Sequence, residues 1–243
     1  MEHPPGVLHL VATPIGNLKD ITFRAIEVLN KADVIACEDT RRSKILLTHF
    51  GIDRPLVSYA DFSEKKKAPA LVEKLLSGAD IALISDAGMP GIADPGYRLV
   101  TAAIREGIRV ECVPGASAIL TALAVSGLPT DRFTFEGFLP VKTGARKNKL
   151  ASLKGEERTV IVYESPHRIL KSLSAIQEVY GDIHLVVARE LTKKFEEVTR
   201  GRVSEIIEKF SSRKPLGEFV ILFNLTARHC EAPQVPKQSR HSQ

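Results

Sequence analysis

Cysteine is scarce in this sequence. The chain has three, Cys37, Cys112 and Cys230, scattered over 243 residues. None belongs to a C-x-x-C pair, and no group of Cys and His residues has the spacing of zinc ligands. An odd, dispersed set is typical of reduced thiols in a cytosolic compartment. We therefore expect a cytoplasmic protein without a disulfide framework and without a metal centre.

Long apolar segments are also missing. The longest nearly apolar run covers residues 118–125, whereas a membrane-spanning helix needs about 20 residues. The first five residues, MEHPP, have neither the basic start nor the apolar stretch of a signal peptide. These absences predict a soluble protein.

The sequence lacks the common motifs of several enzyme classes. It contains no G-x-G-x-x-G and no G-x-x-x-x-G-K-[ST], which argues against classical dehydrogenases and phosphate-loop ATPases. It contains no G-x-S-x-G and no H-E-x-x-H, which argues against α/β-hydrolases and zincins.

The composition is that of an ordinary globular protein. Hydrophobic residues make up 44% and charged residues 26%, and 243 residues suffice for one large domain or two small ones. The net charge is +5 and the pI is about 9.1. This moderate excess is compatible with a nucleic-acid partner and equally with a small ligand.

The first half of the chain alternates apolar, β-rich segments with amphipathic helical ones. Strands are expected at 7–12, 33–37, 56–59, 81–84 and 108–113. Helices are expected up to Asn30, at 40–50, at 68–76 and at 95–106, the last with Asp94 as N-cap and Pro95 in its first turn. This alternation predicts a parallel sheet with helices on both faces, and ligands bind outside the carboxyl ends of such strands.

The pattern changes at Pro114-Gly115. Helices are expected at 117–126, 146–153, 166–179 and 203–210, and strands at 133–135, 159–163, 184–188 and 218–223. These elements predict a second α/β domain with a mixed sheet. We therefore expect an N-terminal domain over 1–115, a C-terminal domain over 116–227 and a disordered polar tail over 228–243.

The loop at residues 85–96 has the most unusual composition. It holds three Gly and two Pro in twelve residues and exceeds the 2–6 residues usual for a strand-to-helix loop. Such a segment lets the backbone approach a ligand closely. Loops at 12–18 and 113–118 also follow expected strands, so all three are predicted to face one crevice. The alternative is three independent turns.

These loops belong to an ordered set of motifs that resembles a known family. The motifs are ATPIGNLKD at 12–20, EDTR at 38–41, SDAGMP at 85–90 with DPG at 94–96, VPGASA at 113–118, EGFLP at 136–140, YESPHR at 163–168 and ARELTK at 188–193. Together they resemble the ribosomal RNA small-subunit methyltransferase I family, a branch of the tetrapyrrole (corrin/porphyrin) methylases. The resemblance runs from about residue 7 to residue 223. Met89 departs from it, since a threonine is expected before Pro90.

The resemblance implies two α/β domains with S-adenosylmethionine in the cleft between them, in a homodimer. It implies methyl transfer to the ribose 2′-hydroxyl of a cytidine in the decoding region of small-subunit ribosomal RNA. The cofactor-binding residues implied are Pro14, Ile15, Asp86, Ala87, Gly88, Ile92, Ser117, Ala118, Tyr163, Ala188, Pro215 and Leu216. Plain core packing is the alternative for Ile15, Ile92, Ala118 and Ala188.

Methylation of a ribose hydroxyl needs a base or strong positioning, because the hydroxyl is a weak nucleophile. The candidates near the predicted rim are Glu38, Asp39, Glu164, Arg189, Glu190 and Lys193, and the sequence does not decide among them. For Arg189 and Glu190 the alternative is a salt bridge at the domain interface.

Three positive charges, Arg41, Arg42 and Lys44, open one expected helix, where they oppose the helix dipole. This arrangement suits a bound phosphate, although pairing with Glu38 and Asp39 is an equal alternative. Other basic groups are Lys142, Arg146, Lys147 and Lys149, the group Lys193, Lys194 and Arg200, and Lys65–Lys67, which is interpreted as a solvated face. Few of the aromatic residues interleave with these charges, so base stacking is only weakly indicated.

Two other functions stay open on the residues alone. A methylase for a corrin or porphyrin precursor would share the fold but would gain little from the basic helix start. A non-enzymatic RNA-binding assembly factor would not need glycine-rich ligand loops.

Overall fold

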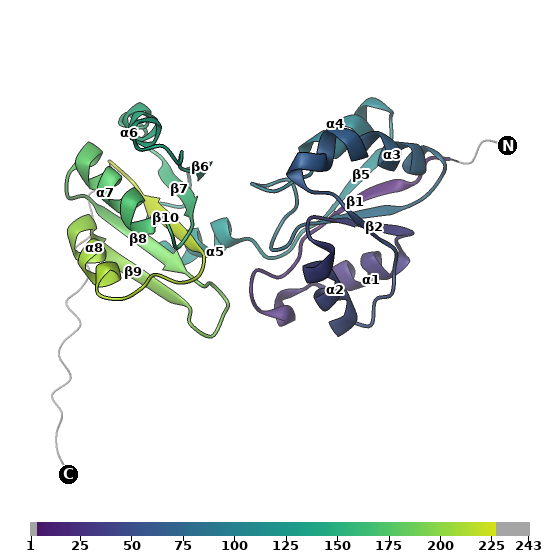
Figure 1. Cartoon of the computed structure of the whole chain (residues 1–243), viewed down its shortest axis with the longest axis horizontal. Helices are drawn as coiled ribbons and strands as arrows, with labels where there is room; N and C mark the ends of the chain where they lie inside the picture. Colours follow the sequence, from purple (N-terminus) through teal and green to yellow (C-terminus); the bar gives the residue numbers. More distant parts are fainter. Residues whose placement is uncertain (1–3, 227–243) are drawn as a thin grey trace, which may run out of the picture.

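The structure is a computed structural model that describes residues 4–226, and in it the chain forms two α/β domains (Figure 1). The predicted polar tail at 228–243 lies outside the described residues. Within residues 4–226, no helix combines the length and the apolar character needed to cross a membrane.

The first domain is built on a parallel five-stranded sheet in the order β3-β2-β4-β1-β5. Its strands are β1 (Val7–Val11), β2 (Val34–Cys37), β3 (Leu56–Ser58), β4 (Ile81–Ile84) and β5 (Arg109–Val113). β2 and β4 are buried along their whole length, which explains their continuous apolar sequences. The predicted parallel sheet is confirmed.

Helices cover both faces of this sheet, also as predicted. Helices α1 (Phe23–Lys31) and α2 (Thr40–His49) pack on one face, and α3 (Glu64–Leu76) and α4 (Tyr97–Arg105) on the other. Short 3-10 helices, η1 (Leu18–Asp20) and η2 (Asp61–Ser63), precede α1 and α3.

The second domain has a mixed sheet in the order β6-β7-β10-β8-β9, in which only the β6–β7 pair is parallel. Its strands are β6 (Phe133–Phe138), β7 (Thr159–Glu164), β8 (His184–Arg189), β9 (Glu197–Arg202) and β10 (Phe219–Phe223). Strand β9 is not among the strands predicted from the sequence. It is an edge strand with a mostly polar sequence, so it lacks the apolar signal of a buried strand.

Helices α6 (Thr143–Ser152), α7 (Ile169–Tyr180) and α8 (Val203–Ser211) cover one face of the second sheet. Helix α5 (Ala118–Ser126) covers the other face. Ile15 of the first domain packs into the same apolar cluster as α5. This cluster therefore ties the loop after β1 to the second domain.

The prediction of Asp94 as the N-cap of α4 is wrong. The helix begins at Tyr97, its N-cap is Gly96, and no side chain caps it. Asp94 instead lines the interdomain cleft close to Ser85. Helix α3 begins at Glu64, four residues earlier than predicted, where the buried Glu64 carboxylate accepts a 2.6 Å bond from the Gly96 N–H.

Candidate active site

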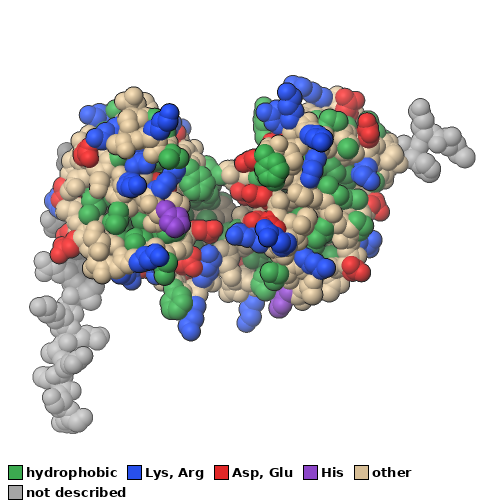
Figure 2. Space-filling model, in the orientation of Figure 1, with side chains coloured by type: hydrophobic (Ala, Val, Ile, Leu, Met, Phe, Trp, Pro, Cys, Tyr) green, Lys and Arg blue, Asp and Glu red, His purple; other side chains and the backbone are tan. Residues whose placement is uncertain are grey.

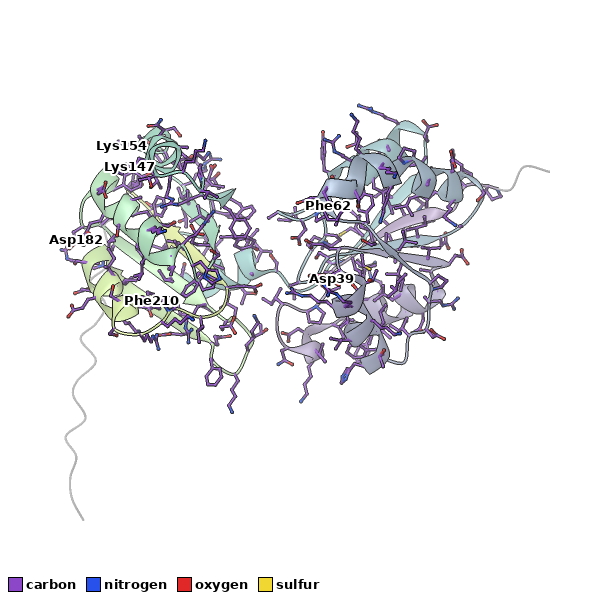
Figure 3. The ribbon with its side chains drawn as sticks, in the orientation of Figure 1. Asp39, Phe62, Lys147, Lys154, Asp182 and Phe210 are labelled. Carbon is purple, nitrogen blue, oxygen red and sulfur yellow. The ribbon has the colours of Figure 1, made fainter. Side chains whose placement is uncertain are left out.

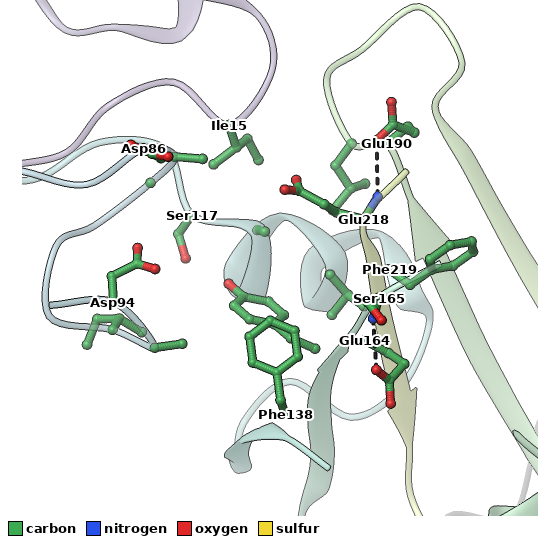
Figure 4. Close-up of a pocket in the computed structure, with 18 of the residues that line it drawn as sticks. Ile15, Asp86, Asp94, Ser117, Phe138, Glu164, Ser165, Glu190, Glu218 and Phe219 are labelled. Carbon is green, nitrogen blue, oxygen red and sulfur yellow. Dashed lines mark hydrogen bonds between the residues drawn. The ribbon is translucent and has the colours of Figure 1, made fainter. Parts of the chain in front are cut away.

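A cleft of about 480 Å³ lies between the two domains (Figure 4). The loops that follow β1, β2, β4 and β5 form its wall on the first domain. They meet there because the strands of this sheet are parallel and their carboxyl ends share one edge. The ends of β7, β8 and β10 contribute the opposite wall. The prediction that the shaped loops face one crevice is confirmed.

The 85–96 loop is fixed by its backbone against the loop after β1. Thr13 and Gly88 exchange two backbone hydrogen bonds, of 2.9 and 3.0 Å. Ser85 Oγ also donates to the Gly88 carbonyl, at 3.2 Å. Gly88 has a φ of +88°, which side-chain-bearing residues rarely adopt. Glycine at this position therefore lets the loop turn back and expose backbone to the cleft.

Carboxylates crowd the wall of the first domain. Burial, followed by repulsion from Asp94, Asp86 and Asp61, raises the pKa of Glu38 to about 7. Burial is also the largest cause that raises the pKa of Asp94 to about 6. Arg42 Nη1 lies 3.2 Å from Asp86 Oδ2 and keeps that carboxylate paired. The cleft thus holds two carboxyl groups that titrate close to neutral pH.

The wall of the second domain carries a lysine between two carboxylates. Lys193 Nζ lies 2.9 Å from Glu190 Oε1 and 3.4 Å from Glu218 Oε2. Burial works against ionisation of Glu190, but the bonds from Lys193 and from the Glu218 backbone N–H outweigh it and lower its pKa. Glu190 has a φ of +50°, so its backbone is strained where its side chain meets Lys193.

Aromatic rings form part of the cleft wall on the second domain. The Tyr163 ring packs against Phe135 and Phe138, with centroids 4.8 and 5.7 Å away. Burial raises the pKa of Tyr163 to about 12, so its hydroxyl stays protonated. Tyr163 and Phe138 both line the cleft (Figure 4). This part of the wall therefore offers flat apolar surfaces and one hydroxyl.

Most of the residues expected to hold the cofactor line this cleft. They are Ile15, Asp86, Ala87, Gly88, Ile92, Ser117, Ala118 and Tyr163. Pro14, Ala188, Pro215 and Leu216 are not among the lining residues of the described chain. Ala188 is fully buried in the core of the second domain. Leu216 is exposed, and its carbonyl accepts a 2.8 Å bond from Arg189.

Only some of the candidate catalytic residues line the cleft. Glu38, Glu164, Glu190 and Lys193 line it, whereas Asp39 and Arg189 are outside the lining set. Asp39 caps α2, and Arg189 pairs with Glu197 at 2.8 Å within the second domain. Arg189 and Glu190 both find partners in their own domain, so the interdomain salt bridge is not formed by them.

Glu164 is buried among its own partners. Its carboxylate accepts bonds from Arg168, at 2.7 Å, and from Ser172, at 2.5 Å. A carboxylate so fully occupied is better suited to holding β7 and α7 together than to taking a proton.

The basic residues expected to meet RNA fall into different environments. Lysine and arginine side chains lie on both domains beside the hollow between them, and acidic side chains lie within it (Figure 2). Arg41 is exposed and pairs with Asp39 at 2.9 Å, while Lys44 is exposed on α2. The alternative of pairing with nearby carboxylates is therefore realised for Arg41.

The expectation that Arg146 belongs to a basic surface at the start of α6 is wrong. Its side chain is 2% exposed and donates to the carbonyls of Pro140 and Val141 at 3.1 and 2.9 Å. It therefore anchors a turn rather than facing solvent. Lys147 and Lys149 form ion pairs with Glu178 and Glu136, and Lys142 is exposed.

Several residues of the cleft are not among those predicted from the sequence. They are Met89, Ala93, Asp94, Phe138, Ser165, Pro166, Leu191, Glu218, Phe219 and Val220. Phe138 and Ser165 lie inside the EGFLP and YESPHR motifs, so these motifs could have indicated them as cleft residues. Asp94 was assigned to a helix cap, and the residues of β10 carried only the signal of a buried strand.

Comparison with known proteins agrees with this architecture. Residues 7–207 match the model of the tetrapyrrole (corrin/porphyrin) methylases. A solved diphthine synthase superposes with a TM-score of 0.71 at 19% identity, covering 89% of this chain and 90% of that one. A cobalt precorrin-4 methyltransferase superposes with a TM-score of 0.63 at 18% identity, covering 89% and 94%. The fold and the cleft therefore define a methyltransferase of the tetrapyrrole methylase class.

Relatives at much higher identity narrow the class. A ribosomal RNA small subunit methyltransferase I of Haemophilus influenzae is 50% identical over 89% of this chain and 78% of its own length. One of Thermotoga maritima is 48% identical over 90% of this chain and 98% of its own length. The chain belongs to the ribosomal RNA small subunit methyltransferase I family.

Proposed function

We propose that this methyltransferase uses S-adenosylmethionine to methylate the ribose 2′-hydroxyl of a cytidine in the decoding region of small-subunit ribosomal RNA, as a homodimer. The observation that carries the proposal is the interdomain cleft built on the Thr13–Gly88 backbone bridge, in a chain about 50% identical to relatives with this printed name. The ribose position and the nucleotide follow from the family resemblance.

The residues of the cleft fit S-adenosylmethionine. Its volume lies within the range of small-molecule sites, and such sites combine apolar walls with a few polar groups. Ile15, Ile92 and Val220 supply apolar surface. Acidic side chains outnumber basic ones in the lining, which suits a cofactor that carries a positive sulfonium. Tyr163 and Phe138 offer ring surfaces for an adenine.

We assign the role of general base to Glu38. When bound, S-adenosylmethionine supplies an electrophilic methyl group on a sulfonium. The Glu38 carboxylate would accept the proton of the ribose 2′-hydroxyl as its oxygen takes up this methyl group, which would leave the cofactor sulfur as a neutral thioether. A pKa of about 7 suits this role, because a base works best when its pKa is near the working pH. Glu190 is less suited, since Lys193 holds it ionised and occupied.

The RNA is proposed to reach the cleft across the exposed cations at its edge. Arg41 and Lys44 lie on α2, next to the loop that carries Glu38. Lys142 lies on the second domain, and Lys193 lines the cleft. Phosphate contacts from these side chains would position the nucleotide without reading its base.

Transfer of tritiated methyl groups from S-adenosylmethionine tests the function. Isolated small ribosomal subunits, naked ribosomal RNA and a porphyrinogen would be compared as acceptors. Labelled RNA would then be hydrolysed with alkali, which cannot cleave the linkage after a 2′-O-methylated nucleotide. Label in an alkali-resistant dinucleotide that begins with cytidine is the expected result. Label on a base, or only on the porphyrinogen, would refute the proposal.

A further inference from the structure

Phe62 and Tyr97 are exposed aromatic side chains of the first domain near the cleft. Phe62, in η2, is 94% exposed, and Tyr97, at the start of α4, is 75% exposed. Leaving a ring of this size in water forgoes the free energy of its burial. Folding of this chain therefore gives no reason for phenylalanine at position 62.

Glu64 holds the segments of these two rings together. Its buried carboxylate accepts a 2.6 Å bond from the Gly96 N–H through Oε1. Its Oε2 lies 3.7 Å from Arg98 Nε. Because Gly96 and Arg98 flank Tyr97, and Phe62 is two residues before Glu64, one buried carboxylate fixes the backbone on which both rings stand.

This part of the first domain adjoins the cleft. Asp61 precedes Phe62, and its charge acts on Glu38 and Asp94, both of which line the cleft. In Figure 3, Phe62 lies at the edge of the first domain that faces the second. Tyr97 directly follows the 85–96 loop. A chain entering the cleft from this side would therefore pass both rings.

Cations accompany the rings. Lys65 and Lys66, in the first turn of α3, are exposed, and the Arg98 side chain is 59% exposed. Aromatic side chains beside lysine and arginine form the combination that binds single-stranded nucleic acid, since bases stack on the rings and phosphates meet the cations. A second protein surface would have to place carboxylates opposite these positive charges, whereas RNA carries a negative charge on every phosphate.

We propose that Phe62 and Tyr97, with Lys65, Lys66 and Arg98, form a stacking platform that binds unpaired bases of the RNA next to the target nucleotide. The platform rests on the proposed RNA substrate. It goes beyond it by assigning base stacking to a surface distinct from the α2 cations.

The absence of tryptophan from the chain gives a direct test. A Phe62→Trp variant keeps a stacking ring and introduces a single fluorescent reporter. Its emission should be quenched when a single-stranded 12-nucleotide oligoadenylate is added. The matched control is Ile104→Trp, because Ile104 is 60% exposed at the far end of α4, and its emission should stay unchanged.

Alanine variants measure the effect on affinity. Phe62→Ala should weaken binding of the oligonucleotide and of small subunits by about five- to a hundredfold, which is the cost of one lost stacked base. Lys65→Ala with Lys66→Ala should weaken it further, while Lys74→Ala, at the other end of α3, should not. Calorimetric affinity for S-adenosylmethionine should be unchanged in all of them.

Three results would overturn the platform. One is wild-type RNA affinity in Phe62→Ala, and another is unquenched emission of Phe62→Trp with bound RNA. The third is a loss of self-association in Phe62→Ala on size exclusion, which would make the surface a contact between copies. If the wild type methylates small subunits and Phe62→Ala matches it, only the platform fails. If the wild type neither binds nor methylates RNA, the proposed function fails with it.

Discussion

The backbone N–H of Asn17 donates a 3.1 Å hydrogen bond to Thr192 Oγ1, which joins the loop after β1 to the turn after β8 across the two domains. The neighbouring Gly16 also lies close to this turn after β8. A Cβ at position 16 would lie 2.4 Å from Lys193 Cγ and 2.9 Å from Thr192 Oγ1. This junction sets the distance between the Ile15 side of the cleft and Lys193.

Substitution of Gly16 should therefore move one wall of the cleft. In Gly16→Ala the 192–193 turn must shift, and we expect turnover to fall by roughly tenfold to a hundredfold, since misplacement of about 1 Å can cost that much. The thermal unfolding temperature should also fall by a few degrees, because Gly16 and Thr192 adjoin Ile15 and Leu191 of the apolar cluster shared by the two domains. Steady-state methyl transfer and calorimetry check both expectations.

Gly144→Ala is the matched control for this change. A Cβ at Gly144 meets nothing within 4 Å, and the residue lies in α6. Alanine there should leave turnover unchanged and stabilise the helix by about 0.5–1 kcal/mol. Equal turnover of Gly16→Ala and Gly144→Ala would show that the junction does not position the cleft.

Substitution of Glu38 by Gln should raise stability but lower activity. Its pKa is raised from 4.5 to about 7 in the folded state. Between these values the folded chain holds a proton that the unfolded chain has lost. Stability contributed by this group is therefore complete below pH 4.5 and declines as the pH rises towards 7. Glu38→Gln should thus melt higher than the wild type at pH 8 and equally at pH 4.

The same variant should lose activity. The wild-type rate should rise with pH to a plateau, with a midpoint near 7, because only the ionised carboxyl accepts a proton. Glu38→Gln should lose roughly 10²- to 10⁴-fold in turnover while still binding S-adenosylmethionine. Asp39→Asn is the control, as it changes the adjacent carboxyl, which caps α2 outside the cleft lining. A variant at Glu38 with full turnover would reassign the base, and Asp94 would be tested next.

The sequence predicted the strands that position this site better than the protonation of its side chains. The strands that place the cleft loops, such as β2 and β4, are buried on both faces, so their apolar sequences were unambiguous. The raised pKa of Glu38 could not be predicted, because it depends first on burial and then on Asp94, Asp86 and Asp61, which only the fold brings near. Strand β9 was missed because an edge strand can be polar.

Local patterns also misassigned individual side chains. Asp94 before Pro95 has the form of a helix start, but Asp94 lines the cleft and the helix begins later. Phe62 is followed by a lysine run that was interpreted as a solvated face, and nothing in the sequence placed Tyr97 near it. The bond between Glu64 and Gly96 brings these two distant segments together, and a linear sequence pattern does not indicate such a contact.

Arg146 should act on stability instead of on RNA. Its two hydrogen bonds to the carbonyls of Pro140 and Val141 are made by a buried guanidinium. Arg146→Ala should lower the free energy of unfolding by about 2–4 kcal/mol, because charge-assisted bonds are lost and carbonyls are left without donors. Urea denaturation checks this value.

The neighbouring Lys142 gives the contrast for Arg146. Lys142→Ala should leave unfolding within about 0.5 kcal/mol of the wild type, as is usual for an exposed residue, and should weaken RNA binding. Weak RNA binding by fully folded Arg146→Ala would restore Arg146 to the RNA surface.

Arg41 and Arg42 are adjacent in sequence, but their substitution by alanine should affect RNA and cofactor binding differently. Arg41 is exposed and pairs with Asp39 at the rim, whereas Arg42 pairs with Asp86 inside the cleft. Arg41→Ala should reduce the slope of log affinity against log salt by about 0.7, the value for one phosphate contact on a single strand, and leave affinity for S-adenosylmethionine unchanged. Arg42→Ala should weaken binding of both ligands, because Asp86 loses its ion pair and keeps only the bond from the Asp39 N–H to hold it beside Glu38 and Asp94. RNA titrations at several salt concentrations and cofactor calorimetry on each variant measure the two effects. Identical profiles for the two variants would mean that the Arg42–Asp86 pair does not connect RNA binding to the cofactor cleft.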